Sequence, residues 1–442
     1  MVYEEALAYL EELSVFGVRL GLSRIEKLLA LLGMPQNQYR SVHVTGTNGK
    51  GSVSAMLEEI LLASSIRTGL YTSPHLVSYT ERIRVDGKPV SEVEFGDCMG
   101  KVKACVDRMV ADGEESPTQF EVLTAAAFFC FAAHHVEYAV VEVGLGGLLD
   151  STNVIHPEVS VITNVSFEHA AQCGGTLEGI AYHKAGIIKE GVPVVTAAKW
   201  FPLEIIRQEA RARNAKLHVF GKDFQSRVTS FDTHGQRLEF TAPSLGIGAE
   251  SYELRLLGEH QAQNCALALM AAGLLRLQEK RITLEAAQKA LKTVAWPGRF
   301  ELVRLGEQDV LLDGAHNPAG IHALRNGLDQ YFPKEPRTFL LGILRDKDMD
   351  TMLETLLREE DAVVVTEPIS GRAAPADEVA SLARQRSRNV AVRENADKAL
   401  SLALKQAEGK RLLVVSGSLY LIGYIRARLM EKLRERGMPL EH

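Results

Sequence analysis

The sequence predicts an α/β protein in which a P-loop parallel-sheet domain is followed by a smaller, Rossmann-like α/β domain. The first observation is segment 42–54, VHVTGTNGKGSVS, where a β-branched run ends in a glycine-rich turn and an apolar helical segment. The second is that helix and strand patterns alternate through most of the chain, as in a parallel sheet covered by helices. The third is the length of 442 residues, which exceeds the ~250–300 residues that one hydrophobic core usually serves.

The elements of the first domain follow from hydrophobic spacing. Two amphipathic helices precede the glycine-rich turn, at 3–13 and 23–32. After the turn the patterns predict helices at 52–64, 91–111, 119–134 and 176–188, and strands at 138–143, 159–164 and 192–196. Residues 215–257 change to short alternating strands (219–220, 237–240 and 252–257), which we interpret as an antiparallel flank of the same domain. Helices at 259–276 and 283–292 close it.

A hinge is predicted at Trp296-Pro297-Gly298, which breaks the chain after a helix. We therefore place one domain at 1–295 and a second at 296–442. In the second domain the alternation restarts, with strands at 309–313, 337–342, 361–366 and 411–416 and helices at 318–330, 348–358, 375–386 and 395–407. Such a doubly wound domain binds ligands at the carboxyl ends of its strands.

The glycine-rich turn has the layout of a phosphate-binding loop, with backbone N–H groups and a helix N-terminus facing an anion. Gly46, Gly49 and Gly51 permit close backbone approach and positive φ angles. Lys50 would reach the β- and γ-phosphates, and Ser52 would offer its hydroxyl to Mg²⁺. The glycine spacing is not the standard one, and the alternative is a glycine-rich turn with an accidental lysine.

Bulk properties exclude several classes of function. Hydrophobic residues make up 46% and charged residues 24%, as in an ordinary globular protein, and the net charge of −6 argues against a nucleic-acid partner. The five cysteines are scattered without a C-x-x-C pair, which fits reduced thiols in the cytoplasm and gives no zinc site. The N-terminus is acidic where a signal peptide would be basic, and no apolar stretch reaches the ~20 residues of a membrane span. We expect a cytoplasmic protein without membrane contact.

Two polar residues are candidates for a metal site beside the loop. Glu142 ends the apolar strand that precedes a glycine-rich turn, so it is either a Mg²⁺ ligand or a buried acid satisfied by nearby N–H groups. The first interpretation fits better, because a Mg²⁺ ligand in a P-loop sheet lies at the tip of a neighbouring strand. Ser73 would supply a hydroxyl to the same ion; the alternative is a simple turn serine.

Sequence blocks spread over nearly the whole chain carry a family resemblance. They are GTNGKGS at 46–52, SPHL at 73–76, ERIR at 81–84, VEVGLGG at 141–147, ITNV at 162–165 with His169, KAGIIK at 184–189, GEHQAQN at 258–264, WPGRFE at 296–301, DGAHNP at 313–318 and SGSLY at 416–420. In the residues of these blocks and in their order along the chain, the protein resembles the folylpolyglutamate synthase/dihydrofolate synthase branch of the ATP-dependent Mur-type amide ligases. Agreement of this extent does not arise by chance.

The resemblance implies an ATP-dependent ligase with two Mg²⁺ ions. A carboxylate of the acceptor attacks the γ-phosphate, and the amine of L-glutamate then attacks the resulting acyl phosphate. The acceptor would be a folate and also dihydropteroate, and closure of two domains across the hinge would shield the acyl phosphate from water. We expect a monomer.

The resemblance also assigns roles to residues of the first domain. Thr47, Asn48, Gly49, Lys50, Gly51 and Ser52 would bind ATP, with Lys50 acting in catalysis. His169 would join a second Mg²⁺ site. Lys184 would be catalytic as a carbamate that bridges the two ions; a surface lysine paired with Glu178 or Glu190 is the alternative, since a bare ammonium beside two divalent ions would be repelled.

Further roles concern the acceptor, the nucleotide and glutamate. The positions that match acceptor contacts are Thr118, Gln119, Phe120 and Asp150. Arg299 would be catalytic at the γ-phosphate, where a guanidinium stabilises spread charge, although a surface salt bridge is the alternative. Asn264 and Asp313 match adenine and ribose contacts. His316, which we also expect to act in catalysis, and Ser416 match the glutamate site.

Two other functions stay open at this point. A Mur ligase of peptidoglycan precursors would carry an extra domain ahead of the phosphate loop, whereas here only two helices precede Gly46. A P-loop ATPase without ligase activity would have no use for His316, Ser416 and a second α/β domain. Two departures from the family pattern bear on the site: Leu148 stands where a basic residue is frequent, and Glu168 replaces a common aspartate.

Overall fold

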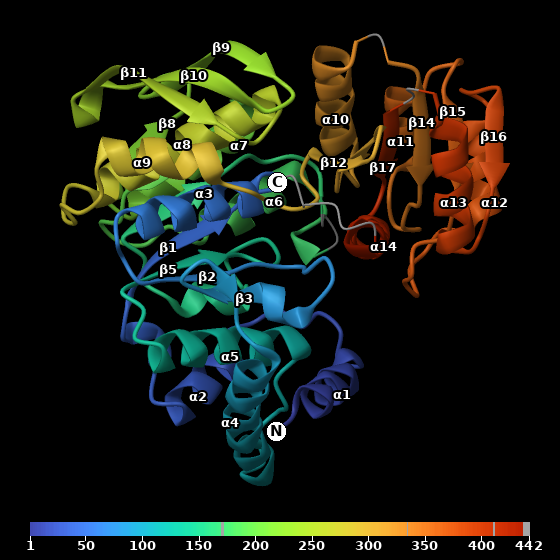
Figure 1. Ribbon diagram of the computed structural model, residues 1–442. Coiled ribbons are helices and arrows are strands. Elements are labelled where there is room, and N and C mark those ends of the chain that lie inside the picture. Colours follow the sequence, from blue (N-terminus) through green and yellow to red (C-terminus); the bar gives the residue numbers. More distant parts are fainter. Residues whose placement is uncertain (169–171, 334, 410–411, 436–442) are drawn as a thin grey trace. The chain divides into compact units, whose positions relative to one another are not determined.

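Figure 1 shows the computed structural model, which describes residues 1–168, 172–333, 335–409 and 412–435. The chain forms two compact units. The first comprises residues 1–230, 237–254 and 261–294. The second comprises residues 231–236 and 255–260 and the chain from Ala295 onward. In the part of the chain so described, no helix has both the length and the apolar character that crossing a membrane requires.

An eight-stranded sheet with the order β4-β3-β2-β5-β1-β6-β7-β8 is the centre of the first unit. Its strands are β1 (Arg40–Thr45), β2 (Thr68–Tyr71), β3 (Ile83–Val85), β4 (Lys88–Pro89), β5 (Tyr138–Glu142), β6 (Val159–Ile162), β7 (Val194–Thr196) and β8 (Leu217–Val219). The strands from β2 to β8 in this order run parallel, and only β3, which pairs antiparallel with both β2 and β4, runs in the opposite direction. The loops after β1, β2, β5 and β6 therefore meet at one edge of the sheet, where such sheets bind ligands.

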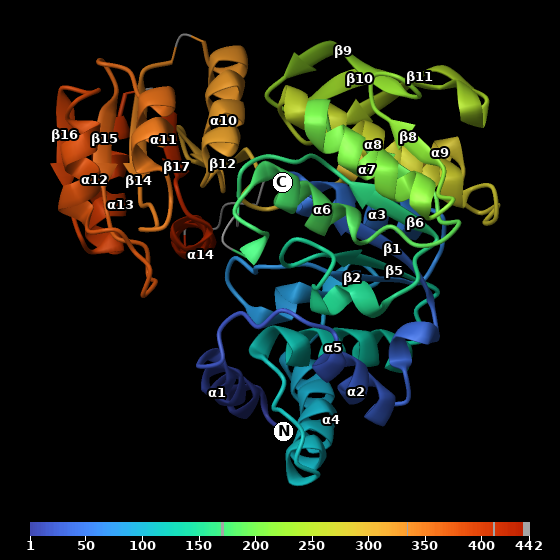
Figure 2. The ribbon, with the colours of Figure 1, turned by 180° about the vertical axis from the view of Figure 1, so that it is seen from behind.

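Helices cover both faces of this sheet. They are α1 (Tyr3–Ser14), α2 (Ser23–Leu31), α3 (Lys50–Ala63), α4 (Glu92–Ala111), α5 (Gln119–Ala133), α6 (Leu177–Ala185), α7 (Trp200–Ala212), α8 (Glu259–Leu275) and α9 (Leu284–Thr293). Helix α3 lies on one face and α5 on the other, with α1, α2 and α4 beyond α5 (Figures 1 and 2). Because α5 is enclosed between the sheet and these three helices, it is apolar on all sides.

The second unit is built on a six-stranded sheet with the order β12-β13-β17-β14-β15-β16. Its strands are β12 (Glu301–Leu305), β13 (Gln308–Leu312), β14 (Arg337–Leu341), β15 (Ala362–Val365), β16 (Asn389–Val392) and β17 (Leu412–Ser416). Only β12 is antiparallel. The helices are α10 (Pro318–Tyr331), α11 (Met349–Leu356), α12 (Ala376–Ala383), α13 (Ala396–Ala407) and α14 (Leu419–Glu435). The first three share one core, and right-handed crossovers place α13 on the opposite face.

The region 215–257 differs from its prediction. Residues 219–220 were expected in an antiparallel flank, but β8 pairs parallel with β7 and extends the main sheet. The separate sheet consists of β9 (Gln225–Asp232), β10 (Gly235–Ala242) and β11 (Ile247–Leu254) in the order β11-β10-β9. A strand of three residues is too short for its hydrophobic pattern to show which sheet it joins. Helix α7 connects β7 to β8 and so allows the two strands to pair in parallel, but the sequence analysis did not predict this helix.

Candidate active site

The phosphate loop lies between β1 and α3, at the carboxyl edge of the first sheet. Gly46 and Gly49 have φ angles of 151° and 86°, in or near the region that side chains rarely adopt. Gly51 does not share this feature, because α3 already begins at Lys50 and Gly51 lies in its first turn. The prediction of a positive φ at Gly51 is therefore wrong, whereas the strand, loop and helix follow in the expected order.

The loop after β6 fixes the phosphate loop in place. Asn164 Oδ1 accepts a hydrogen bond from Asn48 N at 3.0 Å, and Asn164 Nδ2 donates to Asn48 O at 2.9 Å. Thr163 Oγ1 donates to the same carbonyl at 2.6 Å. Thr47 N donates to Asn164 O at 3.0 Å, and Thr47 Oγ1 accepts from Ser166 N at the same distance. These contacts pre-organise the loop, which is what anion binding by backbone N–H groups requires.

Lys50 and Ser52 occupy the first turn of α3. Lys50 Nζ donates to Gly46 O at 3.0 Å and to Thr47 O at 3.3 Å, so the ammonium lies over the phosphate loop. Ser52 is buried, and its Oγ accepts from Gln261 Nε2 at 3.1 Å. Asn264 Nδ2 donates to Gln261 Oε1 at 3.0 Å. A Cβ on Gly49 would lie 2.4 Å from Asn264 Oδ1, so Asn264 directly adjoins the loop.

Glu142 and Ser73 meet at the ends of β5 and β2. Glu142 is buried, and its Oε2 accepts a hydrogen bond from Ser73 N at 3.2 Å. Among the residues that the structure describes, no group of three or more His, Cys, Asp or Glu side chains is arranged to hold a metal ion.

Lys184 is a buried cation on α6, with 6% of its surface exposed. Its pKa is lowered to about 7, mainly by burial and also by the charge of Lys50, whereas the charges of Glu168 and Asp150 act in the opposite direction. The turn 144–148 packs on α6, since Leu148 N donates to His183 O at 2.7 Å and a Cβ on Gly147 would lie 2.7 Å from the same oxygen. A substantial fraction of Lys184 is therefore a neutral amine at neutral pH. His169 lies outside the described residues.

Asp150 organises the turn after β5. It is buried, which raises its pKa, and its Oδ2 accepts from Leu145 N at 2.8 Å. Its Oδ1 accepts from Thr152 N at 3.0 Å and from Thr152 Oγ1 at 2.6 Å. These bonds explain the shape of the turn without any ligand. Leu148 packs against the C-terminal end of α6, so the first departure from the family pattern lies in the turn that packs on the helix of Lys184.

The predicted acceptor residues lie together at the N-terminus of α5. Thr118 caps this helix, since its Oγ1 accepts from Glu121 N at 3.3 Å. Gln119 Nε2 donates to Leu10 O at 2.9 Å and to Tyr79 Oη at 3.4 Å. Phe120 packs on Tyr71 with ring centroids 6.1 Å apart, and a Cβ on Gly144 would lie 2.4 Å from its ring. Of the three residues, Phe120 therefore contacts the end of β2 and the turn after β5, whereas Gln119 contacts α1 and Tyr79.

In the second unit, Arg299 and Asp313 lie beside each other. Arg299 Nη1 donates to Gly298 O at 3.1 Å, and a Cβ on Gly314 would lie 2.2 Å from that nitrogen. Asp313 is buried, which raises its pKa, while the charge of Arg299 lowers it. Its carboxylate accepts from Phe300 N at 2.8 Å and from Ala315 N at 2.9 Å. Burial lowers the pKa of His260 to about 4, and Arg299 contributes to this shift.

His316 and Ser416 lie in the loops after β13 and β17. His316 Nδ1 is 2.7 Å from Gly314 O, and Ser416 Oγ donates to Ala315 O at 3.3 Å. Because β13 and β17 are parallel neighbours, their carboxyl ends bring these two residues and Asp313 to one edge of the second sheet. Each unit therefore has a polar cluster at the carboxyl ends of its strands.

Comparisons with known proteins agree on one family. Residues 44–272 match the Mur ligase middle domain, and residues 300–429 match the C-terminal domain of dihydrofolate synthetase. The dihydrofolate synthase/folylpolyglutamate synthase of Bacillus subtilis (strain 168) is 34% identical over 433 residues, which are 97% of this chain and 99% of that protein. The chain belongs to the dihydrofolate synthase/folylpolyglutamate synthase family.

Solved structures confirm the predicted fold class for this family member. Mycobacterium tuberculosis folylpolyglutamate synthase complexed with ADP has a TM-score of 0.88 and 34% identity, covering 97% of this chain and 99% of that one. Escherichia coli FolC in complex with DHPP and ADP has a TM-score of 0.86 and 29% identity, covering 99% of each chain. Dihydrofolate synthases and folylpolyglutamate synthases are ATP-dependent ligases, so the chain is an enzyme of this class. The predicted family is confirmed as well.

Several residues that build the site of this family member were not singled out from the sequence. Thr163 and Asn164, which clamp the phosphate loop, belong to the quoted block ITNV, and Gln261 belongs to GEHQAQN. Tyr79 contacts Gln119 and the ring of His75, which belongs to SPHL, and His75 in turn accepts from Arg82, which belongs to ERIR. The blocks marked the segments, but only the fold shows which side chains meet.

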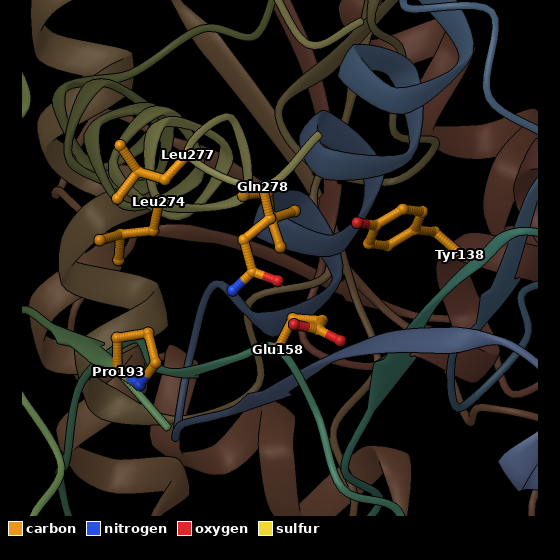
Figure 3. A pocket seen from close by; sticks show the side chains of 7 residues that line it. Tyr138, Glu158, Pro193, Leu274, Leu277 and Gln278 are labelled. Atoms are coloured by element: carbon orange, nitrogen blue, oxygen red, sulfur yellow. The ribbon is translucent and has the colours of Figure 1, made fainter. Parts of the chain in front are cut away.

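A small pocket lies at the other edge of the first sheet (Figure 3). It has a volume of about 80 Å³ and is lined by Tyr138, Glu158, Pro193, Leu274, Leu275, Leu277 and Gln278. Tyr138 begins β5, and Glu158 and Pro193 directly precede β6 and β7. The pocket is therefore at the amino ends of the strands and is not part of the candidate site.

Proposed function

We propose that the chain uses ATP to join L-glutamate to the carboxylate of a folate and of dihydropteroate, through an acyl phosphate. We assign ATP binding to residues 1–295 and glutamate binding to residues 296–442. The observation that carries the proposal is one edge of the first sheet, where a clamped phosphate loop, a buried carboxylate at Glu142 and a buried lysine at Lys184 occur together. Family membership supplies the reaction class.

The first unit would hold the nucleotide and the reacting carboxylate. Backbone N–H groups of 47–52 and the ammonium of Lys50 neutralise phosphate charge, and Asn264 beside Gly49 would contact the adenine. Mg²⁺, when bound, would supply further charge neutralisation at the phosphates, with Ser52, Ser73 and Glu142 as its protein ligands. The acceptor would lie along Thr118, Gln119, Phe120 and Asp150, next to this edge.

Lys184 would act as an anion. A neutral amine adds CO₂ and releases a proton, which converts the lysine into a carbamate, and burial makes the neutral amine available near pH 7. The carbamate, together with His169, would hold a second Mg²⁺ ion. The charge of Glu168 acts against this step, because it raises the pKa of Lys184 and so favours the ammonium.

The second unit would supply groups for the nucleotide and for glutamate. Asp313 presents a carboxylate suited to ribose hydroxyls, and Arg299 a guanidinium suited to the transferred phosphoryl group. His316 and Ser416, at the same edge of the second sheet, are suited to the carboxylates and amine of glutamate, with His316 placed to accept the proton that the attacking amine loses. We further propose a cytoplasmic monomer, in which the five cysteines remain unpaired as they are here.

The experiment that tests this function is ADP release measured with each component omitted in turn. We expect release only when ATP, Mg²⁺, L-glutamate and an acceptor are all present, with both dihydropteroate and tetrahydrofolate serving. Release that needs neither glutamate nor acceptor would mean an ATPase without ligase activity. Release that needs a nucleotide-linked peptidoglycan precursor instead would mean a Mur ligase.

A further inference from the structure

An arginine, a histidine and a tyrosine form a stacked cluster in the segment between β2 and β3. Arg82 Nε donates to His75 Nδ1 at 2.9 Å, so this imidazole nitrogen is unprotonated. The rings of His75 and Tyr79 are 4.3 Å apart, and Arg82 Cζ lies 5.0 Å from the centroid of Tyr79. We call these three residues the Arg82 cluster. It holds the guanidinium in one orientation, because the ring of Tyr79 lies against its face and the ring of His75 accepts a hydrogen bond from its Nε.

The guanidinium of Arg82 has no carboxylate partner among the described residues. Its one hydrogen bond goes to a neutral imidazole, which leaves both terminal nitrogens available. The adjacent acid, Glu81, is engaged elsewhere, since it accepts from the backbone N–H groups of Leu76, Val77 and Ser78. A half-buried, orientated guanidinium without an anion is suited to bind a carboxylate in bidentate fashion.

The Arg82 cluster adjoins the expected acceptor residues. Gln119 Nε2 donates to the hydroxyl of Tyr79 at 3.4 Å. Tyr71 packs on Phe120, and burial raises the pKa of its phenol, on which the charges of Arg82, Asp150 and Glu142 also act. Ser73, two residues before His75, contacts Glu142 at the tip of β5. Arg82 is therefore a cation close to the place where the acceptor carboxylate would react, but not on the phosphate loop.

The two acceptors of the proposed function differ in the number of their carboxylates. Dihydropteroate has one, on its benzoate, and that group itself becomes the acyl phosphate. A folate ends in glutamate and has two, so the γ-carboxylate reacts while the α-carboxylate keeps its charge. A site that buries this second anion must provide a counter-charge, because an unpaired charge away from water is costly.

We propose that Arg82 binds the α-carboxylate of the terminal glutamate of a folate acceptor, and that His75 positions it. Arg82 is then a specificity-determining residue, needed for extension of folates and dispensable for addition of glutamate to dihydropteroate. This inference rests on the proposed function, since it presumes that the wild-type chain extends both acceptors.

The test compares the two acceptors in Arg82→Ala. We expect KM for tetrahydrofolate to rise about 10- to 100-fold, the usual loss for one charge-assisted hydrogen-bonded pair, with a smaller change in kcat. KM for dihydropteroate should stay within about threefold of wild type, well below the effect of losing such a pair. Arg82→Lys should restore part of the folate affinity. Arg67→Ala is the matched control, since Arg67 pairs with Asp86 on an exposed part of the same sheet.

A second measurement uses an acceptor in which γ-aminobutyrate replaces glutamate, so that only the α-carboxylate is missing. For wild type, KM for this analogue should be as high as KM for tetrahydrofolate is in Arg82→Ala. The substitution Arg82→Ala should not raise KM for the analogue any further. His75→Ala, which frees the guanidinium, should raise KM for tetrahydrofolate by a smaller factor and leave the analogue unaffected.

The outcomes separate the two hypotheses. If wild type extends neither acceptor, the proposed function fails. If wild type extends both, and Arg82→Ala weakens both acceptors or the analogue equally, Arg82 is a general part of the site and the inference is wrong. A wild-type chain that uses dihydropteroate alone also overturns the inference, because a subsite for an α-carboxylate would then have no occupant.

Discussion

Gly46 and Thr163 approach so closely that a Cβ on Gly46 would lie 1.8 Å from Thr163 Oγ1. The same hydroxyl donates to Asn48 O at 2.6 Å. The hydroxyl of Thr163 can occupy this position only because Gly46 has no side chain. Through it the loop after β6 presses on the phosphate loop after β1. The shape of the nucleotide site thus depends on a contact between residues 117 positions apart in the sequence, the separation of 46 and 163.

Gly46→Ala should disrupt this contact. The backbone at Gly46 has a φ of 151°, which side chains rarely adopt. The new methyl group would also clash with Thr163, so either the phosphate loop or the loop after β6 must shift. We expect loss of most ligase activity and a decrease in the free energy of unfolding of about 1–3 kcal/mol. Urea denaturation and ADP release measure the two effects.

The control for this substitution is Gly248→Ala on β11, where an added Cβ would meet nothing within 4 Å and φ is not in the left-handed region. That variant should keep normal stability and turnover. Normal activity of Gly46→Ala would show that the phosphate loop tolerates a wider separation from the loop after β6 than the structure has.

The parallel order of the first sheet was predictable, because long apolar strands and amphipathic helices alternate in the sequence. Helix α7 was not, since only Pro202, Ile206 and Ala210 of it are buried and Trp200 begins it fully in solvent. By contrast, α14 was missed although Leu421, Ile425 and Leu429 have helical spacing. A narrow buried stripe therefore explains why α7 was missed, whereas the hydrophobic spacing that indicates α14 is present in the sequence.

Individual residues of the candidate site could be predicted from the sequence, but the contacts between the loops that hold them could not. Lys50, Ser52 and Glu142 follow from the rule that ligands lie at the ends of parallel strands. The carbonyl of Asn48, clamped by Thr163 and Asn164, could not be derived in this way, because which loop touches the phosphate loop depends on the strand order β5-β1-β6. Strand order arises from the packing of the whole chain.

Lys50→Ala should abolish ATP-dependent ligation with little loss of stability. Among the described residues, the hydrogen bonds of its side chain go to the carbonyls of Gly46 and Thr47 in its own loop. ADP release should therefore fall to background while the urea midpoint stays near that of wild type. Near-normal turnover of this variant would remove the loop from the reaction.

Arg299→Ala should lower kcat by a large factor, on the order of 10²–10³, as loss of one charge contact in a transition state does. Its effect on the affinity for ATP should be smaller, because the group would act on the transferred phosphoryl. The matched control is Arg304→Ala, a cation of the same unit that pairs with Asp309 in an exposed hairpin. Unchanged kcat in Arg299→Ala would make Arg299 a structural residue beside Asp313.

His43 should make the first unit sensitive to acid. This fully buried imidazole on β1 bonds to Thr152 Oγ1 at 2.9 Å, and burial lowers its pKa to about 3. An unfolded chain binds the proton near pH 6.5, whereas the folded chain does so only near pH 3. The free energy of unfolding should therefore fall as the pH decreases through this range, by up to about 1.4 kcal/mol per pH unit for the one proton. In His43→Gln the slope should be shallower by that amount; parallel curves in urea titrations would contradict the prediction.

Lys184 should be carbamylated in the active enzyme. Its pKa of about 7 makes the neutral amine abundant at pH 8, and only the neutral amine adds CO₂. Lys184→Ala should lose most activity, and acetate or formate, which can occupy the vacated anion position, should restore part of it. Wild type incubated with ¹³C-bicarbonate should give a carbamate carbon signal that is absent from Lys184→Ala and retained in Lys189→Ala, whose lysine bonds to Asn153 O. The signal and the activity should decline together as the pH falls below 7, since protonation of the amine competes with CO₂. A fully active Lys184→Arg variant would rule out the carbamate, because a guanidinium keeps its proton throughout this range and cannot become an anion.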